Sequence, residues 1–266
     1  MSPSSSPIPR RRPSPETPYI PHNRRTWDRT SARYDRKFSR VLGGRSAEAW
    51  GLWRDPESRL HLLGSPRGQR VLELGCGAAR WSISLARRGA RPVGLDLSKA
   101  QLSRAKELSQ RSRHRIPLLR ANAERLPFAP ASFDLVFSDW GAMTFADPYR
   151  TVPECARVLR RGGRLVFAAA GPFSLAAWDV RRDRLGRWLR NEYFGQHRVE
   201  FKRSEPVEFR LTYGDWITLF RDSGFAIDRL VESRPPPGVE SAYLTRKASE
   251  WARRWPLECL WQVRKE

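Results

Sequence analysis

The chain is predicted to adopt an α/β fold: a doubly wound, mainly parallel sheet of seven strands whose last strand is antiparallel. Three observations favour it. Strand-like apolar runs alternate with helical patterns through the middle of the chain. One run turns through Gly75 and Gly77 into a helix, and the next strand ends in an acid, Asp96. Parallel strands with helices on both faces produce this alternation.

The individual strands are expected where short apolar runs lie between helical segments. Gly162 stands where a helix C-cap belongs, and Asp147-Pro148 is typical of an N-cap followed by a first-turn proline. A helix and a strand follow over 211–232, and an alternating strand at 257–263 is expected to pair antiparallel with its predecessor. The five core strands are placed near 70–74, 91–95, 116–120, 133–138 and 163–169.

One domain with an N-terminal tail is expected. Residues 1–22 are rich in Pro, Ser and Arg with almost no apolar content, so they are predicted to be disordered. Removal of the tail through Ile20 is therefore expected to leave the melting temperature nearly unchanged. Residues 23–266 are predicted to form the domain, divided into an N-terminal helical cap (23–65), a cofactor-binding core (66–170), a substrate-cap insertion after the fifth strand (171–212) and the C-terminal part of the sheet (213–266).

Three helices outside the core are predicted from apolar spacing. Two precede the sheet, a short one at 27–35 and an amphipathic one at 47–63. The third lies in the insertion near 178–190, where apolar residues fall on one helical face and arginines on the rest. Its apolar residues are Trp178, Leu185, Trp188 and Leu189, and its arginines are Arg181, Arg182, Arg184, Arg187 and Arg190.

The glycine turn after the first core strand predicts a nucleotide-cofactor crevice. Glycine permits positive φ and lets the backbone approach a ligand closely, and the helix that follows directs free N–H groups to the same spot. A dinucleotide fingerprint would need a third glycine where Arg80 stands, which disfavours a nicotinamide cofactor. A plain strand-to-helix turn without a ligand is the structural alternative.

The motifs around this turn resemble those of the class I S-adenosylmethionine (SAM) dependent methyltransferases, within the ubiquinone- and menaquinone-biosynthesis-like group that acts on small molecules. The resemblance covers about residues 65 to 170 and implies a Rossmann-like sheet, SAM as cofactor and S-adenosylhomocysteine as product. The family usually has Asp where Asn122 stands and Pro where Arg161 stands. The matching segments are Glu73–Ala79, Val93–Ser98, Asn122–Phe128, Ser132–Ser138 and Arg157–Phe167.

The resemblance implies a role for each matched residue. Asp96 would take the two ribose hydroxyls, where the spacing from the glycine turn also places a carboxylate. Glu73 would act through water on the methionine amino group, Leu97 would pack on adenine, and Asn122 with Ala123 would read the adenine edge. The expected cofactor-binding set is Glu73, Gly75, Cys76, Gly77, Asp96, Leu97, Asn122, Ala123, Asp139, Trp140 and Tyr34.

Two residues are candidate general bases for proton removal from an acceptor. Asp139 follows the fourth strand, and His197 lies among aromatic residues of the insertion. Their structural alternatives are a loop cap for Asp139 and a surface histidine for His197. No metal site is expected, because Cys76, Cys155 and Cys259 lack ligand spacing; the same cysteines suggest a reducing, cytoplasmic compartment.

Three functions remain open at this stage. Transfer of a methyl group from SAM to a small-molecule acceptor by in-line displacement is the leading hypothesis. An RNA or other nucleic-acid methyltransferase is the alternative, because the formal net charge is +22. The third is a SAM-binding protein without catalysis. No membrane span is expected, since no apolar run approaches roughly 20 residues.

Overall fold

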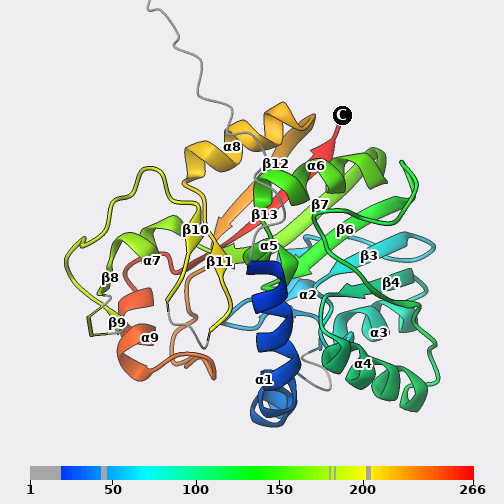
Figure 1. Ribbon diagram of the computed structural model, residues 1–266, viewed down its shortest axis with the longest axis horizontal. Helices are drawn as coiled ribbons and strands as arrows, with labels where there is room; N and C mark the ends of the chain where they lie inside the picture. Colours follow the sequence, from blue (N-terminus) through cyan, green and yellow to red (C-terminus); the bar gives the residue numbers. More distant parts are fainter. Residues whose placement is uncertain (1–18, 43–46, 180, 183, 202–204) are drawn as a thin grey trace, which may run out of the picture.

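The computed structural model describes residues 19–42, 47–179, 181–182, 184–201 and 205–266, and its centre is one seven-stranded sheet (Figure 1). β13 pairs antiparallel with both of its neighbours and the remaining pairs are parallel, which confirms the predicted fold class. In order across the sheet the strands are β12 (Phe225–Glu232), β13 (Glu258–Lys265), β7 (Leu159–Ala170), β6 (Phe133–Asp139), β3 (Arg70–Leu74), β4 (Arg91–Asp96) and β5 (Leu118–Arg120).

Helices cover both faces of this sheet, as Figure 1 shows. On β6, Val136 packs into a cluster with α6 and α8, whereas Leu135 and Phe137 pack with α2 and α3 on the other face. Successive side chains of a strand point to opposite faces, so each strand serves two cores. The helices are α1 (Tyr19–Leu42), α2 (Glu57–Leu60), α3 (Arg80–Arg87), α4 (Lys99–Arg111), α5 (Ala142–Phe145), α6 (Pro148–Val158), α7 (Pro172–Ala176), α8 (Tyr213–Asp222) and α9 (Arg246–Ala252).

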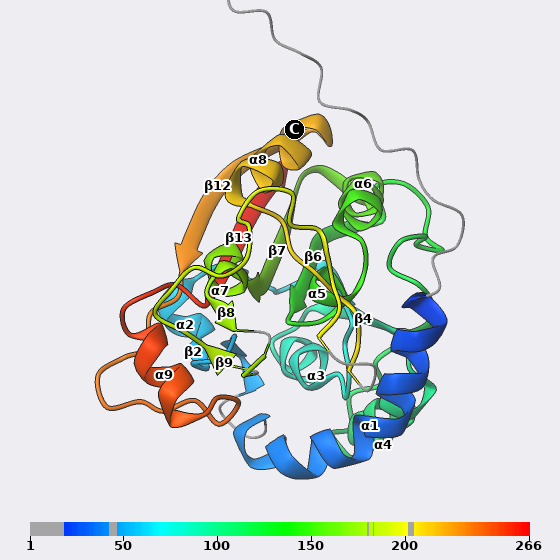
Figure 2. The same cartoon turned by 60° about the vertical axis from the view of Figure 1, so that its left-hand side comes forward.

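Helix α1 is longer than predicted and lies along α4 (Figure 2). Asp28 accepts a hydrogen bond of 2.7 Å from the hydroxyl of Ser98, the N-cap of α4. Asp35 forms ion pairs with Arg80 (2.7 Å) on α3 and Arg104 (3.0 Å) on α4. These contacts hold α1 against the end of the sheet where β3 and β4 finish.

The first turn of α1 corrects the predicted boundary of the tail. Residues 19–22 are helical, and the Tyr19 side chain is buried. Its hydroxyl donates to the Glu124 carboxylate, and its ring packs against Phe209 with centroids 4.9 Å apart. The prediction of disorder is therefore wrong for residues 19–22, and residues 1–18 lie outside the described part of the chain.

Substitution of Tyr19 tests this anchor. Tyr19→Phe removes the hydrogen bond to Glu124 while keeping the ring, so we expect a loss of about 1 kcal/mol, or roughly 2–4 °C in melting temperature. Truncation through Ile20 also removes the buried ring and should lower the melting temperature further, contrary to the expectation from the sequence. Calorimetric melting measures both. A truncated chain that melts with the full chain would contradict the anchor.

The predicted helix over 47–63 is wrong. The chain forms a hairpin of β1 (Ala49–Trp50) and β2 (Asp55–Pro56), followed by the single turn of α2. Gly51 at φ +64° and Arg54 at φ +53° turn the backbone in a way no helix allows. Trp50 and Leu60 are still buried against the sheet. The helical spacing of the apolar residues therefore predicted correctly which side chains are buried, but not the backbone conformation.

The predicted arginine-rich helix is also wrong within the described residues. β8 (Trp178–Asp179) and β9 (Arg184–Leu185) pair antiparallel, with Trp178 opposite Leu185. A helix would have placed arginines three and four residues apart, where like charges repel. The insertion continues into a second two-stranded pair, β10 (Arg198–Val199) and β11 (Glu208–Phe209).

The predicted caps are correct in one case and wrong in the other. Asp147 accepts a hydrogen bond from the Tyr149 backbone N–H (3.0 Å), and Pro148 opens α6, as predicted. Helix α6 already ends at Val158, so Gly162, at φ +75°, lies inside β7 and does not cap the helix.

Among the helices of the described residues, none is long and apolar enough to cross a membrane.

Candidate active site

The loop after β3 forms a backbone cradle. Gly75 and Cys76 donate their N–H groups to the carbonyl of Leu95 at 2.8 and 2.9 Å. Gly75 has φ +68°, and a Cβ on it would lie 2.4 Å from the Ala142 nitrogen. A Cβ on Gly141 would lie 2.4 Å from the carbonyl oxygen of Leu74. Only glycine at both positions lets the loops after β3 and β6 come this close.

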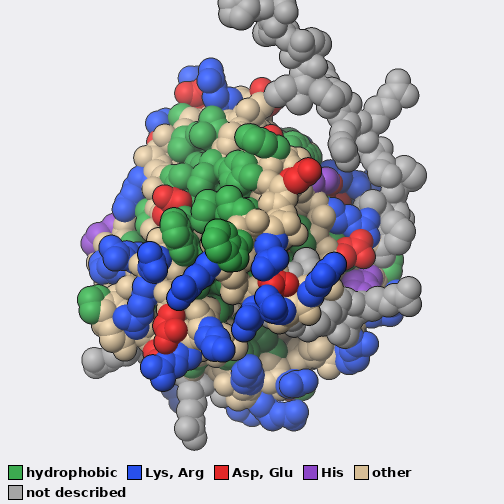
Figure 3. Space-filling model, turned by 90° about the vertical axis from the view of Figure 1, so that its left-hand side faces the viewer, with side chains coloured by type: hydrophobic (Ala, Val, Ile, Leu, Met, Phe, Trp, Pro, Cys, Tyr) green, Lys and Arg blue, Asp and Glu red, His purple; other side chains and the backbone are tan. Residues whose placement is uncertain are grey.

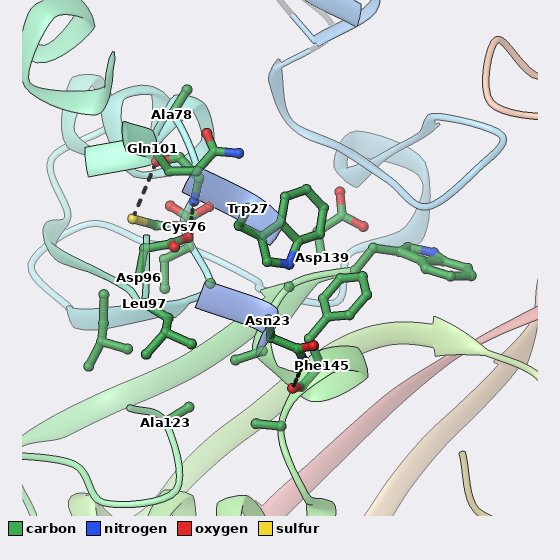
Figure 4. A pocket seen from close by; sticks show the side chains of 18 of the residues that line it. Asn23, Trp27, Cys76, Ala78, Asp96, Leu97, Gln101, Ala123, Asp139 and Phe145 are labelled. Atoms are coloured by element: carbon green, nitrogen blue, oxygen red, sulfur yellow. Dashed lines mark hydrogen bonds between the residues drawn. The ribbon is translucent and has the colours of Figure 1, made fainter. Parts of the chain in front are cut away.

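Asp96 presents a buried carboxylate beside this cradle. It ends β4 and accepts one hydrogen bond on each oxygen, from the Gly77 N–H and the Ser98 N–H, both at 2.8 Å. Burial raises the pKa of this carboxyl. The two hydrogen bonds lower the pKa, but by less than burial raises it. Figure 4 shows Asp96 and Leu97 on one side of the pocket. A carboxylate held here suits a ligand that offers hydroxyl donors.

Glu73 joins β3 to α3 at the base of the pocket. Its Oε2 accepts from the Ser82 N–H at 3.0 Å and from the Ser82 hydroxyl at 2.5 Å. Burial raises the pKa of Glu73 to about 8, and the bonds from Ser82 counteract that rise. A carboxyl whose pKa lies this far above its ordinary value is typical of functional sites.

The opposite end of the pocket is built around Asp139, the last residue of β6. It accepts from the Gly51 N–H (2.8 Å) and the Trp81 indole N–H (3.3 Å), and it pairs with the Arg54 guanidinium at 3.5 Å. Burial raises the pKa of Asp139, and the Arg54 charge lowers it. Trp140 follows at φ +50°, a backbone conformation that costs about 1–3 kcal/mol in a residue other than glycine.

Helix α1 forms the cover of this pocket. Trp27 packs edge-on against Phe145 of α5 (5.1 Å) and against Tyr34 (5.9 Å). Asn23 donates to the carbonyls of Phe145 (3.0 Å) and Val207 (2.9 Å), which fixes the helix at its other end. Figure 4 shows Asn23 and Trp27 facing the pocket. The α1 residues that line it are Tyr19, Ile20, Asn23, Trp27, Tyr34, Asp35 and Leu42.

The structure brings the predicted cofactor-binding residues together around one pocket. Asn122 departs from its expected use in one respect, because its side-chain oxygen accepts a hydrogen bond from the Glu124 N–H at 3.1 Å. The residues that line the pocket from the predicted set are Glu73, Gly75, Cys76, Gly77, Asp96, Leu97, Asn122, Ala123, Asp139, Trp140 and Tyr34.

His197, the second predicted base, lies elsewhere. Its Nε2 is 3.0 Å from Oδ1 of Asp147 at the start of α6, and its ring packs against Tyr149 and Phe209. Among the residues described within 171–212, none lines the pocket. The insertion meets α1 instead, where the Val207 N–H donates to the Asn23 side-chain oxygen at 2.7 Å.

Sequence reasoning missed several residues that line the pocket. The sequence around Arg54 does not indicate a role in the pocket. Arg54 reaches Asp139 because residues 49–56 form a hairpin, where a helix was predicted. Asn23 and Asp35 were detectable in principle, as polar and acidic residues on a helix crowded with arginine. The missed lining residues also include Gln101 and Phe145.

Glu258 should make stability fall as the pH rises. Its buried carboxyl accepts from the Trp140 indole N–H (2.7 Å) and the Leu52 N–H (2.8 Å), and burial raises its pKa to about 8. The folded chain keeps a proton that the unfolded chain releases near pH 4.5. Stability from this proton is therefore complete below that pH and is lost as the pH rises toward about 8.

Glu258→Gln places a neutral amide there, so its melting temperature should fall less than that of the wild type between about pH 6 and about pH 8.5. The exposed Glu250→Gln is the control and should follow the wild type. Melting curves at several pH values measure the difference. Parallel pH profiles for Glu258→Gln and the wild type would show that Glu258 is ionised throughout.

The sheet order, the glycine cradle after β3 and the carboxylate that ends β4 are similar to those of class I, SAM-dependent methyltransferases, and the chain carries a methyltransferase domain. A family model described as a methyltransferase domain matches residues 72–167.

Relatives agree with this class. A demethylmenaquinone methyltransferase of Bacillus licheniformis is 35% identical over 43% of this chain and 49% of its own length. One from Listeria welshimeri is 29% identical over 78% of this chain and 89% of its own length. The chain thus spans about half the length of the Bacillus relative. Of solved structures, a SAM-dependent methyltransferase from Mesorhizobium loti is 25% identical, with a TM-score of 0.63 over 78% of this chain and 96% of its own.

Proposed function

We propose that the protein transfers a methyl group from SAM to a small apolar acceptor. The observation that carries the proposal is the pocket itself, which joins the Asp96 carboxylate, the glycine cradle and an aromatic wall under α1. When bound, SAM supplies an electrophilic methyl group on a sulfonium. The protein has to hold an acceptor in line with that group and exclude water, which can contribute roughly 7–11 kcal/mol.

The residues present fit this cofactor. The space that a Cβ on Gly75 would need is already taken by the loop after β6, so the backbone there is closed to side chains. Asp96 would accept hydrogen bonds from both ribose hydroxyls, with the two N–H donors holding the carboxylate in place. Leu97 and Ala123 would enclose adenine, and Asn122 would bind its edge. Glu73 would reach the amino group of the methionine portion through water.

The acceptor is proposed to be a flat, apolar ring. Trp27, Tyr34 and Phe145 present aromatic surface where α1 closes the pocket. Such walls bind ring systems through apolar contact and edge-to-face packing. Relatives named demethylmenaquinone methyltransferases make a demethylated quinone the first acceptor to test.

Asp139 is proposed as the group that takes a proton from the acceptor. It lies at the end of β6 on the pocket wall, and burial raises the pKa of its carboxyl, which makes the carboxylate a stronger base than an exposed one. The carboxylate would take the proton that the acceptor loses when it exchanges that proton for the methyl group of SAM. Arg54 would stabilise the carboxylate between turnovers.

Asp139→Asn is expected to lower kcat by about 10²-fold or more and to leave the Kd for SAM within a few-fold. Because Asp139 also accepts the Gly51 N–H, the melting temperature of the variant is measured in parallel. His197→Gln tests the other predicted base and should stay within a few-fold of the wild-type rate, since His197 does not line the pocket. The opposite pattern, with only His197→Gln impaired, would transfer the role to His197.

The function is tested by label transfer from methyl-labelled SAM, first to a demethylated quinone and then to a cell lysate with and without ribonuclease. Label in solvent-extractable material that ribonuclease does not affect supports the proposal. Label lost with ribonuclease would support a nucleic-acid acceptor, which the net charge of +22 motivates. Tight SAM binding without transfer to any fraction would indicate a non-catalytic binding protein.

A further inference from the structure

The insertion carries large apolar side chains on the outside of the molecule. Trp188 is 73% exposed, Leu189 63% and Phe194 83%, and Trp255, just after α9, is 43% exposed. Single exposed apolar residues are common, but several large ones within seven positions of the chain are not. These four residues are called the insertion tip below.

The backbone beneath the insertion tip is held firmly. The Arg190 and Asn191 N–H groups donate to the Ala176 carbonyl at 2.7 and 3.2 Å. The Asn191 amide donates to the carbonyls of Leu175 (2.8 Å) and Trp178 (2.7 Å), and the Trp251 indole of α9 donates to the Gly186 carbonyl (2.8 Å). Trp188 and Leu189 are therefore exposed on a loop whose backbone is held in place by hydrogen bonds on both sides of them.

Arginines surround the insertion tip. The segment 181–194 holds five arginines against two acids, and Arg253 with Arg254 follows α9, which packs on β9. Figure 3 views the side of the molecule that carries α7, β9 and α9, and it shows hydrophobic side chains beside a band of arginine and lysine. The exposed arginines of the insertion and of the segment after α9 are Arg181, Arg182, Arg184, Arg187, Arg190, Arg253 and Arg254.

We propose that this face docks the protein onto the surface of an anionic lipid bilayer. Tryptophan, phenylalanine and leucine at the tip would enter the boundary between headgroups and acyl chains, where aromatic side chains concentrate. The arginines would bind anionic headgroups around them. Phosphate-rich RNA would engage the arginines but gains nothing from Leu189, and a second copy of the face would bring like charges together.

The segment that precedes α9 contacts the helix that covers the pocket. Tyr243 in that segment packs against Phe38 of α1, with ring centroids 4.6 Å apart. A bilayer at the insertion tip would thus lie beside the helix that covers the pocket. The inference does not rest on the proposed function, because docking needs neither SAM nor an acceptor.

The test is cosedimentation of the full chain with vesicles of phosphatidylcholine and phosphatidylglycerol at roughly 70:30, compared with pure phosphatidylcholine, in about 0.1 M salt. Combined Trp188→Ser, Leu189→Ser and Phe194→Ser should weaken binding to anionic vesicles at least about tenfold. Combined Arg181→Gln, Arg184→Gln and Arg187→Gln should do the same. All these side chains are exposed, so the melting temperature and the Kd for SAM should not change.

The matched control is Arg111→Gln, Arg113→Gln and Arg115→Gln, which removes the same charge at the exposed end of α4 and the residues after it. It should retain vesicle binding. Equal losses in the control and the insertion variants would reduce the effect to net charge and overturn the proposal. Unchanged vesicle binding in the apolar variant would overturn it too. Insertion variants that lose affinity for a single-stranded RNA oligomer but not for vesicles would assign the face to nucleic acid.

Discussion

Gly75→Ala is expected to destabilise the protein severely and to abolish SAM binding. The added Cβ would lie 2.4 Å from the Ala142 nitrogen and 2.8 Å from the Gly141 Cα. Both are backbone atoms of the loop after β6, so relief requires that the two loops move apart. We expect a fall in melting temperature of roughly 10 °C or more and no further rise on addition of SAM.

Gly68→Ala is the control for the backbone conformation alone. Gly68 has φ +76°, close to the +68° of Gly75, but a Cβ there meets nothing within 4 Å. Its cost should be confined to about 1–2 kcal/mol for the left-handed conformation, with the SAM-dependent rise intact. Calorimetric melting with and without SAM measures both variants. Equal losses would show that contact between the loops contributes nothing.

Asp96→Ala is expected to weaken SAM binding by about tenfold or more. A hydrogen bond to a charged group contributes about 1.5–3 kcal/mol, and this carboxylate is proposed to take both ribose hydroxyls. The substitution also leaves the Gly77 and Ser98 N–H groups without their acceptor, which loosens the cradle. Titration calorimetry with SAM measures the effect.

Asp134→Ala serves as the matched control for Asp96→Ala. Asp134 near the start of β6 also accepts a backbone N–H, that of Arg70 at 2.7 Å, and it pairs with Arg160. It does not line the pocket among the described residues, so its loss should leave the Kd for SAM unchanged. An unchanged Kd in Asp96→Ala would place the ribose elsewhere.

The core could be predicted from the sequence because its signals are local. The apolar run 70–74, the glycines at 75 and 77, and the acid at 96 follow each other along the chain, and the strands form at those positions. The N-cap of α4 is equally local in the structure, since the Ser98 hydroxyl accepts from the Gln101 N–H within the same turn. Patterns of this kind depend on neighbours in sequence, so tertiary contacts do not override them.

The hairpin of β1 and β2 and the fold of the insertion could not be predicted, because distant contacts decide them. Trp50 is buried in a hairpin by contacts with Trp81 and Phe137, and Gly186 is held by the Trp251 indole, 65 positions away. His197 sits among aromatic rings as predicted, but those rings are Tyr149 and Phe209, and its charged neighbour is Asp147. Helical periodicity and aromatic neighbours report burial, and neither tells which element will bury the residue.

The attachment of α1 has a kinetic consequence. Asn23, Asp28 and Asp35 hold the helix at three separate points across the pocket, to α5, α4 and α3. We expect a ligand under it to leave when these contacts open, so that its residence time depends on movement of the helix. Entry and exit are then slow compared with diffusion, and the rate of product departure sets an upper limit on turnover. Higher ionic strength weakens the ion pairs of Asp35, so it should raise the rate at which a ligand enters and leaves the pocket as well as change its affinity.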